Sequence, residues 1–326
     1  MSTGLNGVLG IGQETTFGVN VDPTHFIDMK SEDLKGDEGM IKPDTCSGQR
    51  SRRRILPGPI SLAGGFNILA QLDGFLGLAL KGLFGQVTTI DLTGGAYKHK
   101  YTALNQSKLP SYTVYKDMLA EVWSISGFTF SEVTLDGKVG AEVDLAFKGV
   151  AKQQSIISRY SSTITYPSSE PITWADASVT WAGAANTEFE NMSLKINNDI
   201  EAVRTHNNSR FINRAVAKTF EVEGSFEVEY NDDMFRNPLW GSASNTTPQR
   251  SIYPVELKIS YVSLEEISSS GQYYSLIITI PSTVLTAVEP VNSGPNNRIM
   301  MPMAFTAKTD GTKSIQVELI NGDASY

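Results

Sequence analysis

The sequence is poor in the residues that build catalytic and metal sites. It has one cysteine, Cys46, and only three histidines, His25, His99 and His206, in 326 residues. A single thiol forms no internal disulfide, so nothing indicates an oxidising compartment. The histidines lie far apart and none has a partner at ligand spacing, whereas a zinc site needs clustered His or Cys. We therefore expect no metal and no cofactor, and we interpret Cys46 as a small loop or core residue.

Catalytic motifs are missing as well. No glycine-rich loop ends in Lys-Ser or Lys-Thr, and no nucleophile elbow accompanies a histidine. The paired carboxylates Asp232–Asp233 and Glu265–Glu266 are typical of a helix start and a solvated turn. The sequence predicts a protein that is not an enzyme and has no catalytic residue.

Long apolar runs and a leader are also lacking. The most apolar segment, from Phe75 to Phe84, is interrupted by Gly77, Lys81 and Gly82, and it is too short to span a bilayer. The first residues lack the basic start and apolar stretch of a signal peptide. We expect no membrane contact and a protein made in a cytoplasm.

Charge is scarce and unevenly placed. Charged residues make up 19% of the chain and the net charge is −8. Residues 1–165 carry 16 basic and 16 acidic side chains, whereas residues 166–326 carry 11 and 19. Phosphate contacts need Lys and Arg, so an acidic protein is a poor candidate for gripping nucleic acid.

What the sequence does have is alternation of period two, which predicts strands. In TFEVEGSFEVEY, one face carries Phe220, Val222, Phe226, Val228 and Tyr230, and the other carries Glu221, Glu223, Glu227 and Glu229. Further strands are expected over residues 139–147, 255–261 and 274–280. One helix per half is also expected, over residues 72–83 with Asp73 near its start, and after Asn231 with Pro238 as its end.

The chain also repeats itself. Residues 31–35 match 191–195, and residues 60–69 match 220–229, placing Phe66 on Phe226 at an offset of 160. Residues 139–149 match 299–309 at an offset of 158, placing Phe147 on Phe305. We therefore predict two tandem β-domains, 1–165 and 166–326, each with a flanking helix. The Ser/Thr-rich stretch over residues 153–170 is interpreted as the connector.

Sheets of this kind have free edges, and free edges invite pairing with other chains. One solution is a ring in which neighbouring copies supply the missing strands. A mainly β sequence with an internal duplication and no catalytic motif therefore favours the interpretation as a structural subunit that self-assembles.

Specific runs resemble the tail tube proteins of long-tailed, non-contractile bacteriophages. They are GIGQETTFGVNVDPTHFIDMKSEDLK, PITWADASVTWAG with FENMSLKINNDIEAV, AKTFEVEGSFEVEYNDD and the closing SIQVELIN. The resemblance covers nearly the whole chain and consists of strand and turn patterns rather than one invariant motif. It implies β-sandwich or barrel tube domains that form stacked rings, a hollow conduit for DNA during genome ejection.

The resemblance also implies partners and a stoichiometry. The chain would bind itself, together with tape measure, terminator and tip proteins, in a virion tail assembled in the host cytoplasm. Relatives with one domain form hexamers, and relatives with two fused domains form trimers that imitate them. The duplication favours a trimeric ring with pseudo-sixfold symmetry, through which DNA passes without specific binding.

Two sets of site residues follow. The face of Glu221, Glu223, Glu227 and Glu229 is expected to meet water, either in the tube lumen, on the exterior or at an interface. The arginine-rich loops stand where a loop that contacts the next ring would fall, the alternative being solvated basic loops. They contain Arg50, Arg52, Arg53 and Arg54 in the first half, and Arg204, Arg210 and Arg214 in the second.

Two other functions remain open. One is the inner tube of a contractile tail or related injection machine, which shares the fold. The other is a β-sandwich adhesin or carbohydrate-binding module, although Trp123, Trp174, Trp181 and Trp240 are spread over the chain and form no obvious sugar platform. An adhesin would remain a small soluble species, whereas a tube protein would form rings or filaments.

Overall fold

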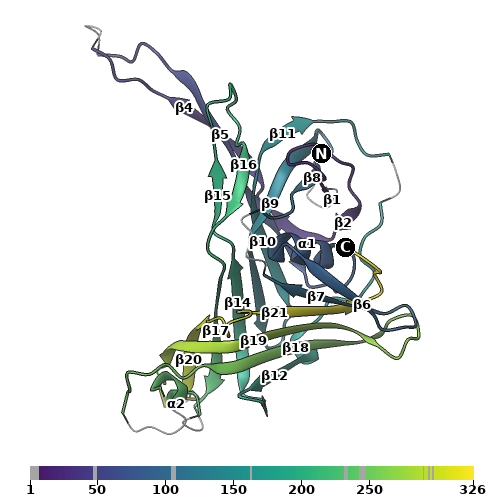
Figure 1. The fold of residues 1–326 in the computed structure, drawn as a ribbon, viewed down its shortest axis with the longest axis vertical. Helices are drawn as coiled ribbons and strands as arrows, with labels where there is room; N and C mark the ends of the chain where they lie inside the picture. The colour runs from purple at the N-terminus through teal and green to yellow at the C-terminus, as the bar shows by residue number, and fades with distance from the viewer. Residues whose placement is uncertain are drawn as a thin grey trace.

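A computed structural model describes residues 7–46, 50–103, 108–161, 164–230, 234–241, 247–288, 290–292, 294–295 and 297–326. Strands dominate these residues, and all named strand pairs are antiparallel (Figure 1). The mainly β prediction is confirmed. The pairs join strand to strand without closing a ring, so the described residues of one chain do not form a closed barrel.

The elements of the first half, residues 1–165, are strands with one helix. They are β1 (Val8–Gln13), β2 (His25–Ile27), β3 (Met29–Glu32), β4 (Lys35–Ile41), β5 (Leu56–Leu69), α1 (Phe75–Phe84), β6 (Val87–Asp91), β7 (Tyr97–Thr102), β8 (Tyr112–Asp117), β9 (Val122–Lys138), β10 (Asp144–Ala151) and β11 (Gln153–Ile156).

The elements of the second half, residues 166–326, begin with a 3-10 turn. They are η2 (Trp174–Asp176), β12 (Ala177–Trp181), β13 (Ala184–Asn186), β14 (Phe189–Asn197), β15 (Ile200–Val203), β16 (Arg214–Ala217), β17 (Glu221–Glu229), α2 (Arg236–Leu239), β18 (Val255–Glu266), β19 (Tyr273–Val288), β20 (Met300–Ala307) and β21 (Gln316–Asn321).

The two halves share one order of strand pairing. In the first, β3 and β4 pair with β5, β5 with β10, and β10 with the second part of β9. The first part of β9 pairs with β8 and β11, β8 with β1, and β1 with β2. In the second half, β14 takes the place of β3–β4 and β17 that of β5. Similarly, β20 takes the place of β10 and β19 that of β9. In the remaining strands, β18 takes the place of β8 and β21 that of β11. The last two, β12 and β13, correspond to β1 and β2 in that order.

Local irregularities recur at matching positions. The register of β3 on β5 shifts between Met29 and Ser31, and that of β14 on β17 shifts between Phe189 and Asn191, 160 residues on. The same offset relates the hairpins. The β15–β16 pair farthest from the turn, Ile200 with Ala217, lies 160 residues from the β4–β5 pair Met40 with Pro57. Bulges of this kind are features of a strand pair rather than defects.

The third matched block needs a correction. Phe147 lies opposite Phe66 in the first half, whereas Met303 lies opposite Phe226 in the second. The offset for β10 and β20 is therefore 156, and the alignment of Phe147 with Phe305 at 158 was wrong by two residues. A slip of two keeps every side chain on the same face, which is why alternation alone did not expose it.

The halves are joined edge to edge through β9 and β14. Seven residue pairs run from Lys138 opposite Asn191 to Glu132 opposite Asn197. One sheet therefore passes through both halves, in the order β3–β4, β5, β10, β9, β14, β17, β20, β19. The hairpin β6–β7 extends the second-half sheet by pairing with β21.

Each half has its own aromatic cluster on the apolar side of this sheet. In the first half, Phe66, Phe75, Phe130 and Phe147 make edge-to-face and tilted ring contacts, with ring centroids 5.5–6.4 Å apart. In the second half, Phe226 contacts Trp181, Phe189, Phe235 and Phe305. Such burial and ring geometry stabilise each half.

The helices and the connector differ in part from expectation. α1 is buried throughout except at Lys81, as the apolar run predicts. α2 is a four-residue helix that contains Pro238 rather than ending before it, and Asn231 lies outside the described residues. The predicted connector begins with β11, which pairs with β9, because Gln153–Ile156 extends the sheet instead of leaving it. No helix of the described residues is both long and apolar enough to cross a membrane.

Candidate assembly surface: the polar face of the joined sheet

The joined sheet has one apolar and one polar face. Along β17, Val222, Phe226 and Val228 are buried, at 2% exposure or less. Glu221 and Glu223, on either side of Val222, are exposed, while Glu227 and Glu229 are half-buried. The four glutamates therefore share the polar face, as the alternation predicts.

The polar face continues across the β9–β14 junction into the first half. The register places non-buried residues beside one another along four neighbouring strands, whereas their alternate neighbours are buried. From β17 inwards, the face includes Lys195 and Asn197 on β14, Glu132 and Asp136 on β9, and Asp144 and Lys148 on β10.

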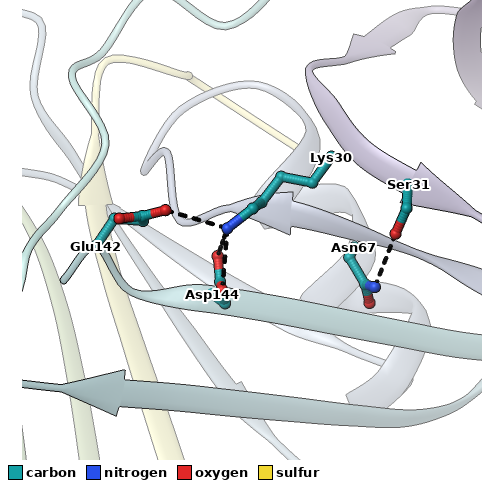
Figure 2. A network of polar contacts seen from close by, with 5 residues as sticks. All are labelled: Lys30, Ser31, Asn67, Glu142 and Asp144. Atoms are coloured by element: carbon teal, nitrogen blue, oxygen red, sulfur yellow. Dashed lines mark hydrogen bonds and ion pairs between the residues drawn. The ribbon is translucent and has the colours of Figure 1, made fainter. Parts of the chain in front are cut away.

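In the first half, the charges on this face are paired. Lys30 Nζ lies 2.8 Å from Asp144 Oδ1 and 3.1 Å from Glu142 Oε1 (Figure 2). These contacts raise the pKa of Lys30, the hydrogen bond to Asp144 contributing most. Beside them, Asn67 donates to Ser31 Oγ at 2.9 Å across β5 and β3.

Glu132 forms ion pairs with both halves at the junction. Its Oε1 accepts from Lys148 of the first half and its Oε2 from Lys195 of the second, each at 2.8 Å. Burial alone would raise the pKa of Glu132, but the hydrogen bonds from the two lysines outweigh it and lower that pKa. The same contact raises the pKa of Lys195, with further help from Glu223 and Glu221.

In the second half, acid exceeds base. Glu227 accepts a hydrogen bond from Asn191, and Glu229 lies 3.1 Å from Arg298. Beside Lys30, Lys138 and Lys148, the first-half part of the face carries four acids, Glu132, Asp136, Glu142 and Asp144. Beside Lys195 and Arg298, the second-half part carries five, Glu190 and the four glutamates of β17. The named charges therefore leave an excess of one acid in the first half and three in the second.

One ion pair recurs with its charges exchanged. Lys30 is the residue at the β3 bulge, and it pairs with Glu142 just before β10. Glu190 is the residue at the β14 bulge, and it pairs with Arg298 just before β20. The offsets are those of the strands, 160 and 156, so the contact is the same in place and opposite in sign.

The two arginine loops lie in different surroundings. Arg210 Nε donates to the Gly58 carbonyl at 2.7 Å, and Arg204 donates to the carbonyl of Ile60 at 2.9 Å. The Ile60 amide in turn donates to the Arg210 carbonyl at 3.0 Å. The second-half loop therefore binds the first half of the same chain, along β5 beyond the end of β10.

The first-half loop is exposed. Arg52 donates to the Lys42 carbonyl and lies 3.4 Å from Asp44, while Arg50, Arg53 and Arg54 are exposed. Arg214, at the start of β16, is exposed too. The loops are thus not equivalent, and the described residues do not bring the seven arginines together.

The hairpin of β4 and β5 projects from the body as an arm, with β15 and β16 beside its base (Figure 1). It carries exposed apolar side chains: Met40, Ile41, Ile55 and Leu56 are 47–65% exposed. Exposed apolar groups gathered on a projecting hairpin mark a contact surface.

The part of the chain that the structure describes assembles no metal site, and its cysteine and buried histidine have other surroundings. Within the described residues, no group of three or more His, Cys, Asp or Glu could hold a metal ion. Cys46 is exposed. His99 is buried, and hydrogen bonds join its ring to Thr89, Asn321 and the Asp323 carbonyl. These contacts fix a side chain between β6, β7 and the C-terminal residues, a structural role.

Sequence reasoning missed the charged residues that organise this surface. Lys30, Glu132, Lys195 and Arg298 meet partners up to 114 residues away in the chain. One signal was available: Lys30 and Glu142 align with Glu190 and Arg298 once the correct offsets are known.

Two halves with one order of strand pairing, joined in one unbroken sheet, define a mainly β protein built on an internal duplication. A family model described as phage tail tube protein matches residues 4–261. The match covers more than three quarters of the chain, so the chain belongs to the phage tail tube protein family, whose members are structural proteins of the virion tail. No curated protein matches the chain.

Proposed function

We propose that this chain forms stacked rings whose joined sheets enclose a conduit for phage DNA. The observation that carries the proposal is the unbroken sheet, which presents four strand positions from each half and ends in two open edges. Within the described residues, no strand covers the outer edge of β3–β4, or that of β19 from Val284 to Val288. Closure by further copies removes such edges.

The duplication supports three chains per ring. The halves have the same pairing order and matching bulges, so each half supplies one equivalent unit to a ring. Three chains then stand in for six single-domain subunits, with the domains divided near residue 165. Closed cyclic symmetry is the usual outcome when one surface patch of a subunit binds a different patch of its neighbour and the rotation closes.

The polar face is the surface that we assign to the lumen. Its second-half part carries Glu221, Glu223, Glu227 and Glu229. Carboxylates repel phosphate, so DNA slides along such a wall without being held. The tandem halves would give the wall alternating sectors of weaker and stronger negative charge.

The projecting arm is the element that we assign to ring stacking. Its apolar residues, Met40, Ile41, Ile55 and Leu56, lose exposure when they contact the next ring. Arg52, Arg53 and Arg54 at its end supply charge-assisted pairs to acidic groups there. Arg204 and Arg210, by contrast, are engaged within the chain and serve the base of the arm.

The test combines imaging with substitution. Purified protein is expected to form rings or tubes in negative stain. The variant with Glu221, Glu223, Glu227 and Glu229 changed to Gln keeps its rings, because Val222, Phe226 and Val228 hold the strand, but DNA ejection changes. Collapsed assembly together with normal ejection from the surviving tubes would contradict the lumen assignment.

A second substitution tests stacking. Arg52, Arg53 and Arg54 changed to Glu should block tube growth and spare ring formation. Arg214→Glu serves as a control, because Arg214 lies away from the arm tip. Unimpaired polymerisation of the triple variant would remove the stacking role.

The inner tube of a contractile tail is the second candidate, since it uses the same subunit design. A sheath gene beside this one would favour it. Siphophage origin and the partners expected by resemblance, the tape measure, terminator and tip proteins, belong to the same proposal.

A further inference from the structure

The β9–β14 junction inside one chain is a complete example of a contact between two tube units. Leu135 lies opposite Leu194, and Val133 opposite Ile196, with all four side chains at 4% exposure or less. The Asn198 amide, one residue beyond the ladder, donates to the Ser131 carbonyl at 2.8 Å. The junction thus combines a backbone ladder, a buried apolar row and the Glu132 ion pairs.

Both open edges of the chain are copies of the two strands that form this junction. The β3–β4 edge corresponds to β14 at an offset of 160, because their bulges and their pairs with β5 and β17 coincide. The β19 edge corresponds to β9. The register of β9 on β10 skips Ser131, and that of β19 on β20 skips Thr286, which is 155 residues further on.

We infer that the internal junction is repeated between chains in its direction and register, at the end of β19 where Ala287 and Val288 correspond to Glu132 and Val133 of β9. The β19 edge of one copy pairs antiparallel with the β3–β4 edge of a second copy, with Ala287 opposite Asp37 and Val288 opposite Gly36. These pairs correspond to Glu132 opposite Asn197 and Val133 opposite Ile196. This inference rests on the proposed ring and adds to it the edges, their direction and their register.

The contact at the base of the arm is repeated in the same way. Within one chain, Arg210 binds the Gly58 carbonyl on β5, where β10 has ended. Subtracting 160 from Arg210 gives Arg50, and adding 160 to Gly58 gives Lys218. Arg50 of the second copy therefore reaches the Lys218 carbonyl of the first. Arg50 is exposed in the single chain and is available for this contact.

The interchain junction differs from its template in charge. Glu132, which binds Lys148 and Lys195 at the internal junction, has Ala287 as its counterpart, and Lys148 has Ala304. The apolar row is reduced as well, because Val133 opposite Ile196 becomes Val288 opposite Gly36, and Leu135 opposite Leu194 becomes Pro290 opposite Leu34. Glycine brings no side chain to the row, and proline brings no N–H to the ladder. We therefore expect chains to separate at the β19 edge under conditions that leave the β9–β14 junction intact.

Disulfide cross-linking tests the register. In a Cys46→Ser background, Asp37→Cys with Ala287→Cys places two thiols opposite each other across the interchain ladder, within disulfide range. Oxidised tubes should give covalent dimers and trimers on a denaturing gel. Lys35→Cys with Ala287→Cys, two residues out of register and about 7–8 Å apart, should cross-link far less.

An internal pair provides the matched control. Asp136→Cys with Ser193→Cys spans the β9–β14 junction and should cross-link within each chain, assembled or not. Tubes that form while the Asp37/Ala287 pair stays reduced, or cross-links less than the Lys35/Ala287 pair, would overturn the register but leave the proposed ring standing. Failure of the unsubstituted protein to form rings would overturn both.

The arginines give a second readout. Arg50→Ala should lower ring assembly several-fold without changing the melting temperature of the dissociated chain. Arg210→Ala should lower that melting temperature, because its contact lies within the chain. Equal effects of the two substitutions on the dissociated chain, with normal assembly of Arg50→Ala, would contradict the repeated contact.

Discussion

The two halves of the chain are alike in backbone and unlike in charge. Their strands pair in one order and their bulges fall at matching residues, yet the polar face is weakly acidic in the first half and more strongly acidic in the second. The Lys30–Glu142 pair and the Glu190–Arg298 pair occupy the same place with opposite signs. The comparison teaches that pairing and core packing preserve the fold, whereas surface charge is free to diverge as long as each pair stays complementary.

The largest expected effect concerns the cores. Phe66 and Phe226 occupy equivalent positions and are each 2% exposed. Changing either to Ala removes a buried ring and leaves a cavity, so each should cost about 3–5 kcal/mol of unfolding free energy. Denaturant titration checks this.

Equivalence of the halves demands similar losses from the two substitutions. A full-sized loss for one and a loss below about 1 kcal/mol for the other would break the comparison, because core truncations in equivalent packing should cost comparable amounts. Biphasic unfolding in only one variant would show which half unfolds first.

Glu132 gives the next effect, because it bridges the halves. Glu132→Gln keeps the shape of the side chain but loses the charge that binds Lys148 and Lys195. The lysines are partly exposed, so we expect a loss of about 1–2 kcal/mol in unfolding free energy. The control, Glu221→Gln, changes an exposed glutamate on the same face and should leave stability within about 0.5 kcal/mol. Equal losses would contradict the bridging role.

Acid should weaken the same bridge. The pKa of Glu132 is lower in the folded chain than its ordinary value of 4.5. Its contribution to stability is therefore complete above that ordinary value and is lost as pH falls through the lowered pKa. Melting temperatures measured from pH 6 downward should fall less steeply for Glu132→Gln than for the unsubstituted protein. Parallel pH profiles would exclude Glu132 as the source.

The smallest expected effect concerns the exchanged ion pairs. Double-mutant cycles with Lys30→Met and Glu142→Gln, and with Glu190→Gln and Arg298→Met, isolate each coupling. Because the four side chains are 28–57% exposed, both couplings should be small, similar in size and reduced by salt. A coupling found in one half alone would show that the repeated geometry does not carry repeated energetics.

Much of the local structure could be read from the sequence. Alternation placed Val222, Phe226 and Val228 in the core, and the apolar spacing located α1. Alternation failed at Val139, which is 55% exposed, because β10 begins only at Asp144. Strand ends depend on turns that periodicity does not register.

The pairing between halves could not be read. Alternation says which face of β9 is buried, but not that its free edge meets β14. That choice depends on contacts between distant segments, such as Glu132 with Lys195. Alternation did place the four glutamates on the face opposite the core, where Glu221 and Glu223 are exposed and Glu227 and Glu229 half-buried. Their place in a lumen stays a prediction.

The most direct measurement is the rotational symmetry of the assembled tube, obtained by electron cryomicroscopy of the purified protein. The account predicts three chains per ring, with a backbone close to sixfold and side-chain density that repeats every 120°. In that map, each β19 edge lies beside the β3–β4 edge of the next chain. Six chains per ring, or chains that form no ring, would contradict the proposed trimeric ring.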